Sequence, residues 1–428
     1  MLHPDRATAE MISPFTEPIS AYVHIPFCRR RCFYCDFPIS VVGNQRRGET
    51  SGTIAQYVER LCAEIAGTPV LGGPLQTVFL GGGTPSLLSV PQLGEVLGTL
   101  RQHFDIAPNA EISMEMDPGT FDRSHLQGYR DLGITRISLG VQAFQDELLE
   151  VCGRFHRVAD VYRAAADLHQ VGIPSWSLDL ISGLPHQTLA QWEQSLSDAI
   201  ALAPSHISVY DLTLEPQTPF GKQYAPGDRP LPLEQTTVEM YCAAQQTLTH
   251  AGYEHYEISN YAQPGHRCRH NLTYWHNQPY YGFGMGATSY THHQRFGRPR
   301  TQRQYAAWLD QYLIDGQIDC GPTPVLERLL DGLMVGLRLA EGVAIAPLET
   351  YFGQGVGSAL HDALAHYIDQ GWVSLSRDRL KLSDPDGFLV SNTILADLFY
   401  QLEIWDSSQT TSNLWDRSSL LASHCPNP

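Results

Sequence analysis

Three cysteines lie close together near the start of the chain, in the stretch Cys28-Arg29-Arg30-Arg31-Cys32-Phe33-Tyr34-Cys35. Spacings of four and three residues allow three thiolates to converge from one loop, and thiolates favour zinc, copper(I) or iron–sulfur centres. A closed structural zinc site takes four ligands, usually as two separated pairs, and no second pair follows downstream. On a four-iron cluster, three thiolates would leave one iron open. The spacing therefore favours a reactive iron–sulfur centre, with a structural zinc site as the alternative.

Other chemically capable residues follow apolar runs that read as β-strands. Three consecutive glycines in Gly81-Gly82-Gly83-Thr84-Pro85 would bring backbone N–H groups to a ligand, although a tight turn explains them equally well. The stretch is not a phosphate loop, because the Lys-Ser/Thr ending is missing. Polar side chains at or beyond the later runs are Glu115, Asp117, Gln142, Arg154 and Asp179. Each could be an ordinary capping or turn residue, but their repeated occurrence at successive run ends indicates one shared site.

The elements that would position these residues alternate from about Ser20 to Gly252. Strands are predicted at Ala21–Ile25, Thr77–Leu80, Glu111–Met116, Thr135–Val141, Ser175–Ile181 and His206–Tyr210. Helices are predicted at Thr53–Ala66, Val90–His103, Phe121–Leu132, Val158–Val171, Leu189–Ala201 and Leu233–Ala251. Such alternation implies a parallel sheet with right-handed crossovers, either doubly wound or curved into a barrel. In both arrangements chemistry collects at the carboxyl ends of the strands, where the residues above lie.

Two further regions follow. Residues 253–290 are crowded with aromatic and histidine side chains, which suits either a turn-rich core or a large flat ligand whose iron a histidine could bind. Beyond Gly321-Pro322, helical runs and a two-stranded run predict a small domain that resembles a winged helix. We therefore expect an N-terminal segment at 1–19, a core at 20–252, a connecting region at 253–320, a C-terminal domain at 321–403 and a flexible tail at 404–428.

Composition limits the classes of partner. Twenty-eight Lys and Arg against 45 Asp and Glu give a net charge of −17, which opposes binding to nucleic acid, and the winged-helix-like domain lacks a basic stripe. No apolar run approaches the roughly 20 residues of a membrane span, and Met1–Ser20 lacks an apolar signal core. Nine scattered cysteines do not form a disulfide framework. We expect a cytoplasmic protein without a transmembrane segment.

In combination these motifs resemble those of radical S-adenosylmethionine (SAM) proteins. The lead-in Tyr22-Val23-His24-Ile25-Pro26-Phe27 and the cysteine spacing are similar to the branch that holds oxygen-independent coproporphyrinogen III dehydrogenase and the HemW haem chaperones. The segments that match this branch in order and spacing are Gly81–Pro85, Gly140–Gln142, Asp179–Ile181 and Gly183–Pro185. The resemblance implies an α/β fold, an incomplete (β/α)6 barrel with a smaller C-terminal domain like that of HemN. It also implies reductive cleavage of SAM to a 5′-deoxyadenosyl radical.

The resemblance also assigns residues. It implies that Cys28, Cys32 and Cys35 bind a 4Fe–4S cluster whose open iron takes the amino and carboxylate groups of SAM. It implies contacts with SAM at Tyr22, Phe37, Gly82, Gly83, Thr84, Glu115, Gln142, Arg154 and Asp179.

Two branches of the family compete. In the dehydrogenase branch a fourth cysteine follows two places after the third and a longer N-terminal arm precedes the first strand, whereas here Phe37 takes that place and only Met1–Ser20 precede. The stretch His270–Trp275, His-Asn-Leu-Thr-Tyr-Trp, matches a motif of HemW-like proteins. The resemblance therefore favours a haem chaperone, with coproporphyrinogen III dehydrogenase as the alternative. His270 is the predicted haem contact, unless its ring only hydrogen-bonds the loop.

The haem-chaperone reading predicts further partners. Haem would pass to a haem-accepting protein, and a flavodoxin or ferredoxin would supply electrons. The basic run Arg29-Arg30-Arg31 reads as a solvated loop face or as a docking site for such an acidic donor.

Overall fold

The computed structural model describes residues 17–43, 48–316, 318 and 320–411, and the side chains of 407–411 are outside this description. The described residues form two compact units, which meet in the chain at Pro322 and Thr323. Most of the predicted N-terminal segment, 1–19, and the end of the predicted tail, 404–428, lie outside the described residues. Among the described helices, none combines the length and the apolar character of a membrane span.

A nine-stranded sheet forms the centre of the first unit, in the order β11-β1-β4-β5-β6-β7-β8-β10-β9. Its six central strands run parallel in sequence order and are β1 (Ser20–Ile25), β4 (Leu75–Gly82), β5 (Ile106–Met116), β6 (Arg136–Gln142), β7 (Ser175–Ser182) and β8 (His206–Asp211). The sheet does not close, because β11 (Tyr281–Phe283) and β9 (Glu254–Glu257) are its two edges. The predicted incomplete barrel of six strands is confirmed.

Three short strands of this sheet were not predicted. β11 pairs in parallel with β1, whereas β10 (Asn260–Ala262) and β9 pair antiparallel at the other edge. All three come from the aromatic region that follows the regular alternation. Each is too short to show a periodic pattern of its own.

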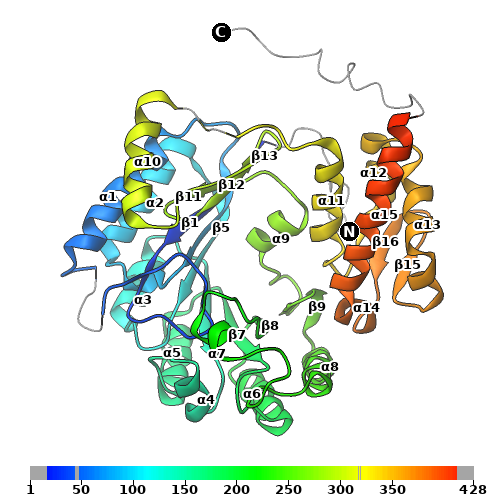
Figure 1. Cartoon of the computed structure of the whole chain (residues 1–428). Helices are drawn as coiled ribbons and strands as arrows, with labels where there is room; N and C mark the ends of the chain where they lie inside the picture. Colours follow the sequence, from blue (N-terminus) through cyan, green and yellow to red (C-terminus); the bar gives the residue numbers. More distant parts are fainter. Residues whose placement is uncertain (1–16, 44–47, 317, 319, 412–428) are drawn as a thin grey trace, which may run out of the picture. The chain divides into compact units, whose positions relative to one another are not determined.

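Helices cover the outer face of the curved sheet (Figure 1). They are α1 (Gly52–Gly67), α2 (Val90–Phe104), α3 (Arg123–Asp131), α5 (Val158–Val171), α6 (Leu189–Ala201) and α8 (Glu234–His250). Local signals fix their ends: Ser89 and Gln92 form a capping box at the start of α2, and Gly172 ends α5 in the left-handed conformation. The predicted helices therefore occur within two residues of their expected ends.

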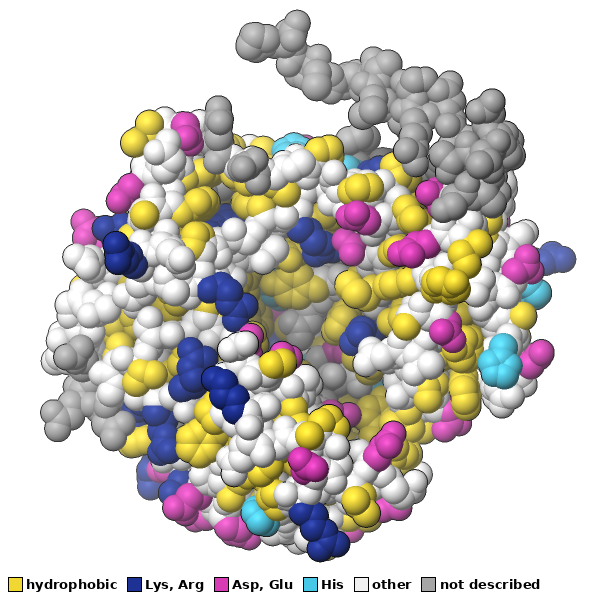
Figure 2. All heavy atoms as spheres, viewed as in Figure 1, with side chains coloured by type: hydrophobic (Ala, Val, Ile, Leu, Met, Phe, Trp, Pro, Cys, Tyr) yellow, Lys and Arg dark blue, Asp and Glu magenta, His cyan; other side chains and the backbone are white. Residues whose placement is uncertain are grey.

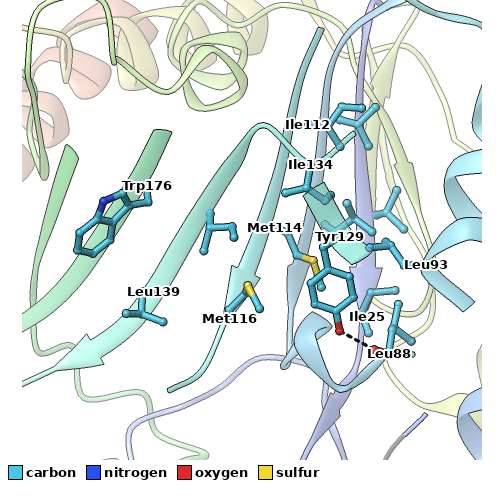
Figure 3. Packing of buried hydrophobic residues seen from close by; sticks show 14 of the residues in the cluster. Ile25, Leu88, Leu93, Ile112, Met114, Met116, Tyr129, Ile134, Leu139 and Trp176 are labelled. Atoms are coloured by element: carbon cyan, nitrogen blue, oxygen red, sulfur yellow. Dashed lines mark hydrogen bonds between the residues drawn. The ribbon is translucent and has the colours of Figure 1, made fainter. Parts of the chain in front are cut away.

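Apolar side chains from strands and helices fill the space between them. Figure 3 shows Met114 and Ile112 of β5 facing Leu93 of α2 and Tyr129 of α3. The Tyr129 hydroxyl, although buried, donates a hydrogen bond of 2.7 Å to the carbonyl of Leu88. Its only polar atom is thus satisfied, and the core holds the carboxyl ends of the strands in fixed positions.

The second unit contains helices and a small sheet. The helices are α11 (Val325–Gly336), α12 (Ile345–Phe352), α13 (Val356–Asp369), α14 (Asp386–Leu389) and α15 (Ser391–Thr411). The predicted hairpin is β15 (Val373–Leu375) with β16 (Arg379–Leu382), and β14 (Val343–Ala344) adds a third strand to it. This order of elements agrees with the predicted winged-helix-like domain, although α15 continues past the expected end at Tyr400.

The connecting region, residues 253–320, packs onto α1 through a buried ion pair. Arg298 and Glu64 of α1, which are 2% and 0% exposed, meet at 2.8 Å. Glu64 also accepts hydrogen bonds from the Gly284 N–H and the Tyr305 hydroxyl, at 2.8 and 2.6 Å. The network ties α1, the turn after β11 and α10 (Gln302–Asp315) together. It thereby fixes the segment that leads to Arg300, a residue of the site described next.

Candidate functional site

A cavity of about 610 Å³ opens at the carboxyl ends of the parallel strands. The predicted site residues that line it are Cys28, Cys32, Cys35, Phe37, Gly82, Gly83, Glu115, Gln142, Arg154 and Asp179. Tyr22 and His270 lie outside its lining, and Thr84 lines a smaller hollow beside it. The sheet therefore brings together most of the residues that successive strand ends indicated, because parallel strands end at the same edge.

The cysteine loop is folded by its own backbone. Its two ends, β2 (Phe27–Cys28) and β3 (Ser40–Val41), pair in parallel. Between them Arg31 donates to the carbonyls of Cys35 and Phe37, both at 3.1 Å. Arg31 is exposed, but its guanidinium closes the loop. The predicted solvated face is thus only part of its role.

Two donors point at the cysteine sulfur atoms. The Thr84 hydroxyl lies 3.6 Å from Cys28 Sγ, and Arg154 Nη1 lies 3.4 Å from Cys32 Sγ. Such donors favour sulfur atoms that carry negative charge, as cluster ligands do. Burial raises the pKa of the Cys28 thiol to about 12, so iron must displace its proton on binding. Within the described part of the chain, no group of His, Cys, Asp and Glu side chains could hold a single metal ion.

Arg154 is the most constrained charge of the cavity. It is 7% exposed, pairs with the carboxylate of Asp117 and donates at 2.7 Å to the carbonyl of Gly140. Its Nε is buried without a hydrogen-bond partner. A buried donor that lacks a partner is costly, and a bound ligand would satisfy it. Asp117 was predicted from its position at a strand end, without a specific role, and its carboxylate orients Arg154.

The glycine run is shaped by its neighbours as well as by any ligand. A Cβ on Gly82, whose φ is +111°, would stand 2.3 Å from the His24 ring, and a Cβ on Gly83 would stand 2.7 Å from the carbonyl of Phe27. The Gly82 N–H donates at 2.8 Å to the Glu115 carboxylate. Glycine is therefore required here because residues of β1 and the start of the cysteine loop approach closely. The sequence predicted access for a ligand or a tight turn, and not this contact.

Two further predicted residues show the local conditions of a binding site. Asp179 on β7 accepts from Ser138 at 2.9 and 3.0 Å, and burial raises the pKa of its carboxyl group. Gln142 ends β6 with a φ of +73°, a conformation that side chains rarely adopt. Such strain is concentrated at functional sites, and here it accompanies an irregularity in the pairing of β6 with β7.

Tyr22 and His24 of β1 form a chain of hydrogen bonds that ends at Pro38 of the cysteine loop. The Tyr22 hydroxyl donates at 2.9 Å to His24 Nδ1, and His24 Nε2 donates at 3.0 Å to the carbonyl of Pro38. The assignment follows from Pro38, whose carbonyl can only accept. Burial lowers the pKa of His24 to about 4, so the ring is neutral. Contact between Tyr22 and SAM stays a prediction, since the hydroxyl is already engaged.

His270 lies in α9 (Arg269–Trp275) and is 0% exposed. Both ring nitrogens are engaged, with the Thr77 hydroxyl and the Tyr274 hydroxyl, each at 2.8 Å. Burial lowers the pKa of the ring to about 3. These contacts match the alternative that the ring hydrogen-bonds the loop. Haem contact by His270 stays a prediction, and iron binding by one ring nitrogen requires the hydrogen bond at that nitrogen to break.

Arg300 was not identified from the sequence. It lines the cavity and donates to Asp36 of the cysteine loop, to the backbone carbonyl at 2.6 Å and to the carboxylate at 3.0 Å. No motif surrounds it, and it reaches the loop only because the segment after β13 (Gln294–Gly297) folds back. Tyr210 and Asp211, at the end of β8, line the cavity as well.

The ionisation of Glu115 gives a testable prediction. Burial raises the pKa of this carboxyl to about 7, so the folded protein holds the proton more tightly than the unfolded chain does. Stability is therefore lost as pH rises through this range. We expect Glu115→Gln to stabilise the metal-free protein by about 3 kcal/mol at pH 8 and by well under about 1 kcal/mol at pH 4, below the pKa of the unfolded chain, measured by urea unfolding. An equal gain at both pH values would contradict this account.

Comparison with known proteins agrees with this geometry. The family described as the radical SAM superfamily matches residues 22–199, and the HemN C-terminal domain matches residues 324–389. The fold resembles that of coproporphyrinogen III oxidase (HemN) from Escherichia coli, a radical SAM enzyme. The TM-score is 0.76 and the identity 22%, over 89% of this chain and 90% of that one. The fold and the cavity thus place this chain in the class of radical SAM proteins.

Relatives with similar sequences identify the family within this class. The chain is 50% identical over 403 residues to "Heme chaperone HemW" of Synechocystis sp., which covers 90% of this chain and 97% of the relative. It is 34% identical over 384 residues to the protein of the same name from Escherichia coli, with 88% and 97% coverage. The chain belongs to the HemW haem chaperone family.

Proposed function

We propose that this protein is a haem chaperone, which binds haem and passes it to an acceptor protein, and that it carries a 4Fe–4S cluster and SAM. The observation that carries the proposal is the 50% identity, across 90% of the chain, to a relative named as a haem chaperone. The cavity supports it, because the three cysteines and seven of the nine predicted SAM residues, all but Tyr22 and Thr84, line one volume.

The residues of the cavity have distinct roles in this proposal. Cys28, Cys32 and Cys35 would hold the cluster, and the cluster would supply the electron for reductive cleavage of SAM. The Arg154 guanidinium, with an unused Nε, offers a hydrogen bond to the ligand. Glu115 offers an acceptor for the amino group of SAM. The carboxylate of Asp179, oriented by Ser138, suits a ribose hydroxyl.

The proposal includes partners beyond haem. An acidic electron donor such as flavodoxin or ferredoxin would approach the cysteine loop in the cytoplasm. Basic side chains gather near this loop on the face drawn in Figure 2, in contrast to the overall charge of −17. Opposite charge steers association, so reduction of the cluster by such a donor should slow as salt rises.

Two assays on the anaerobically reconstituted protein test the proposal together. Titration with haem should produce a new Soret band, and the same protein with SAM, reductant and coproporphyrinogen III should form no protoporphyrinogen. Clear protoporphyrinogen formation would favour the dehydrogenase instead. Absence of haem binding would overturn the chaperone proposal.

The same titration tests the motif at His270. A contact with haem predicts that His270→Ala weakens the Soret band at unchanged fold, whereas a structural role predicts loss of thermal stability with the band intact. Circular dichroism melting of the variant separates the two results, since removal of a buried ring that makes two hydrogen bonds costs several kcal/mol.

A further inference from the structure

The cavity is larger than the predicted SAM residues alone define. Its inner wall carries the strand-end residues from Gly82 to Asp179. A second group of lining residues lies on the cysteine loop, at and just after the end of β8, and before α10, and comprises Arg30, Phe37, Ile39, Tyr210, Leu212 and Arg300. None of these except Phe37 was assigned to SAM. We refer to this group as the outer wall.

Apolar surface on the outer wall is unusually exposed. Phe37 is 61% exposed and Tyr210 is 43% exposed, although both border a cavity. Ile39 and Leu212 add aliphatic surface to the same lining. Large apolar side chains exposed beside a cavity mark a place where a ligand covers them. A flat aromatic ligand would cover Phe37 and Tyr210 most effectively.

This part of the cavity carries charges of both signs. Arg30 and Arg300 line it at the cysteine loop, where Arg300 meets the Asp36 carboxylate at 3.0 Å, and Asp211 and Glu215 line it at and after the end of β8. Arg30 is exposed to solvent. Arg30 and Arg300 thus offer positive charge to an anionic group, which would replace the Asp36 carboxylate at Arg300.

Arg300 is held in place by its neighbours. Arg298, two residues earlier, is fixed by the buried contact with Glu64, and Gln302, two residues later, donates at 3.0 Å to Ser40. Nearby, a Cβ on Gly286 would stand only 2.2 Å from Pro38, so the turn after β11 lies directly on the loop. The guanidinium is therefore presented from a rigid support, which reduces the entropy that a ligand must fix.

We propose that haem binds against the outer wall, with its ring on Phe37, Ile39 and Leu212 and its carboxylates at Arg300 and Arg30. The inference rests on the proposed haem-chaperone function and assigns it a site. A tetrapyrrole with two carboxylates combines the flat apolar face and the paired anionic groups that this wall matches. Arginine binds such carboxylates through charge-assisted hydrogen bonds. His270 belongs to another part of the unit and does not line this cavity.

The test compares ferric haem with its dimethyl ester, in which neither carboxylate is charged. Both are titrated into the full-length reconstituted protein and followed in the Soret region. For the wild type we expect the ester to bind roughly tenfold more weakly than haem, because it loses charge-assisted hydrogen bonds. Arg300→Ala should lower the affinity for haem by a similar factor and leave the affinity for the ester nearly unchanged. Arg300→Lys, which keeps the charge, should have a haem affinity between those of the wild type and Arg300→Ala.

Two control variants separate direct contact from an effect on the loop. Asp36→Asn, in the cavity lining, removes the carboxylate that competes for Arg300 and leaves the guanidinium, so haem should bind at least as tightly as to the wild type. Arg303→Ala removes an exposed arginine of α10 outside the cavity lining and should have no effect. Equal weakening of haem and ester by Arg300→Ala, or unchanged haem binding, would overturn the assignment alone. Failure of the wild type to bind either compound would instead overturn the chaperone function.

Discussion

Alanine in place of Cys32 is expected to abolish assembly of the iron–sulfur cluster. Cys32 lines the cavity with Cys28 and Cys35, and its sulfur receives a hydrogen bond from the buried Arg154. With one of three protein ligands lost, we expect iron after anaerobic reconstitution to fall from about four atoms per chain to below one. The visible charge-transfer absorption should disappear with it. Iron and sulfide analysis of the desalted protein provides the measurement.

Cys152 provides a demanding control for this prediction. It is buried directly beside the loop, where its carbonyl accepts a hydrogen bond of 3.0 Å from the Phe33 N–H. If only the three predicted cysteines are ligands, Cys152→Ala keeps its full iron content, as does Cys62→Ala on α1. Loss of iron in Cys152→Ala would mean that the trio is not the complete ligand set.

The largest effect on stability is expected from Glu64→Ala. This change leaves Arg298, 2% exposed, as a buried charge without its carboxylate, and it also removes the acceptor for Tyr305 and the Gly284 N–H. Breaking a buried pair by removing one partner costs about 3–5 kcal/mol. Urea unfolding of the metal-free protein, followed by tryptophan fluorescence, should show this loss in the transition of the first unit.

A matched comparison uses an exposed ion pair of the same unit. Arg267 and Glu254 meet at 3.1 Å but are 43% and 46% exposed. Solvent screens such a pair, so Glu254→Ala should cost less than about 1 kcal/mol. If Glu64→Ala proved as mild as Glu254→Ala, the Glu64–Arg298 contact could not be what fixes the segment before Arg300.

The core of the fold was predictable because it repeats. Each of the six central strands lies within a residue or two of its predicted range except for a longer β5, and α5 and α6 match theirs at both ends. Long segments with a regular apolar period carry this information locally. The edge strands β9, β10 and β11 have three or four residues each, and their pairing depends on partners far away in the sequence.

Sequence alone determined which residues could form a site and why they meet. Cys28 follows β1, and Glu115 and Asp179 lie in the carboxyl-terminal halves of β5 and β7, so their convergence at one edge is a consequence of topology. The family resemblance, carried by local motifs such as the cysteine spacing, is likewise a property of the sequence.

Only the tertiary structure decided how each side chain is used. In the folded chain Arg154 pairs with Asp117, and both ring nitrogens of His270 make hydrogen bonds. The His24 ring lies so close to Gly82 that a Cβ there would clash. The fold also brings Arg300 to the cysteine loop from more than 250 residues away. The physical reason is that burial, hydrogen-bond partners and charge pairing depend on neighbours in space, which local sequence patterns do not encode.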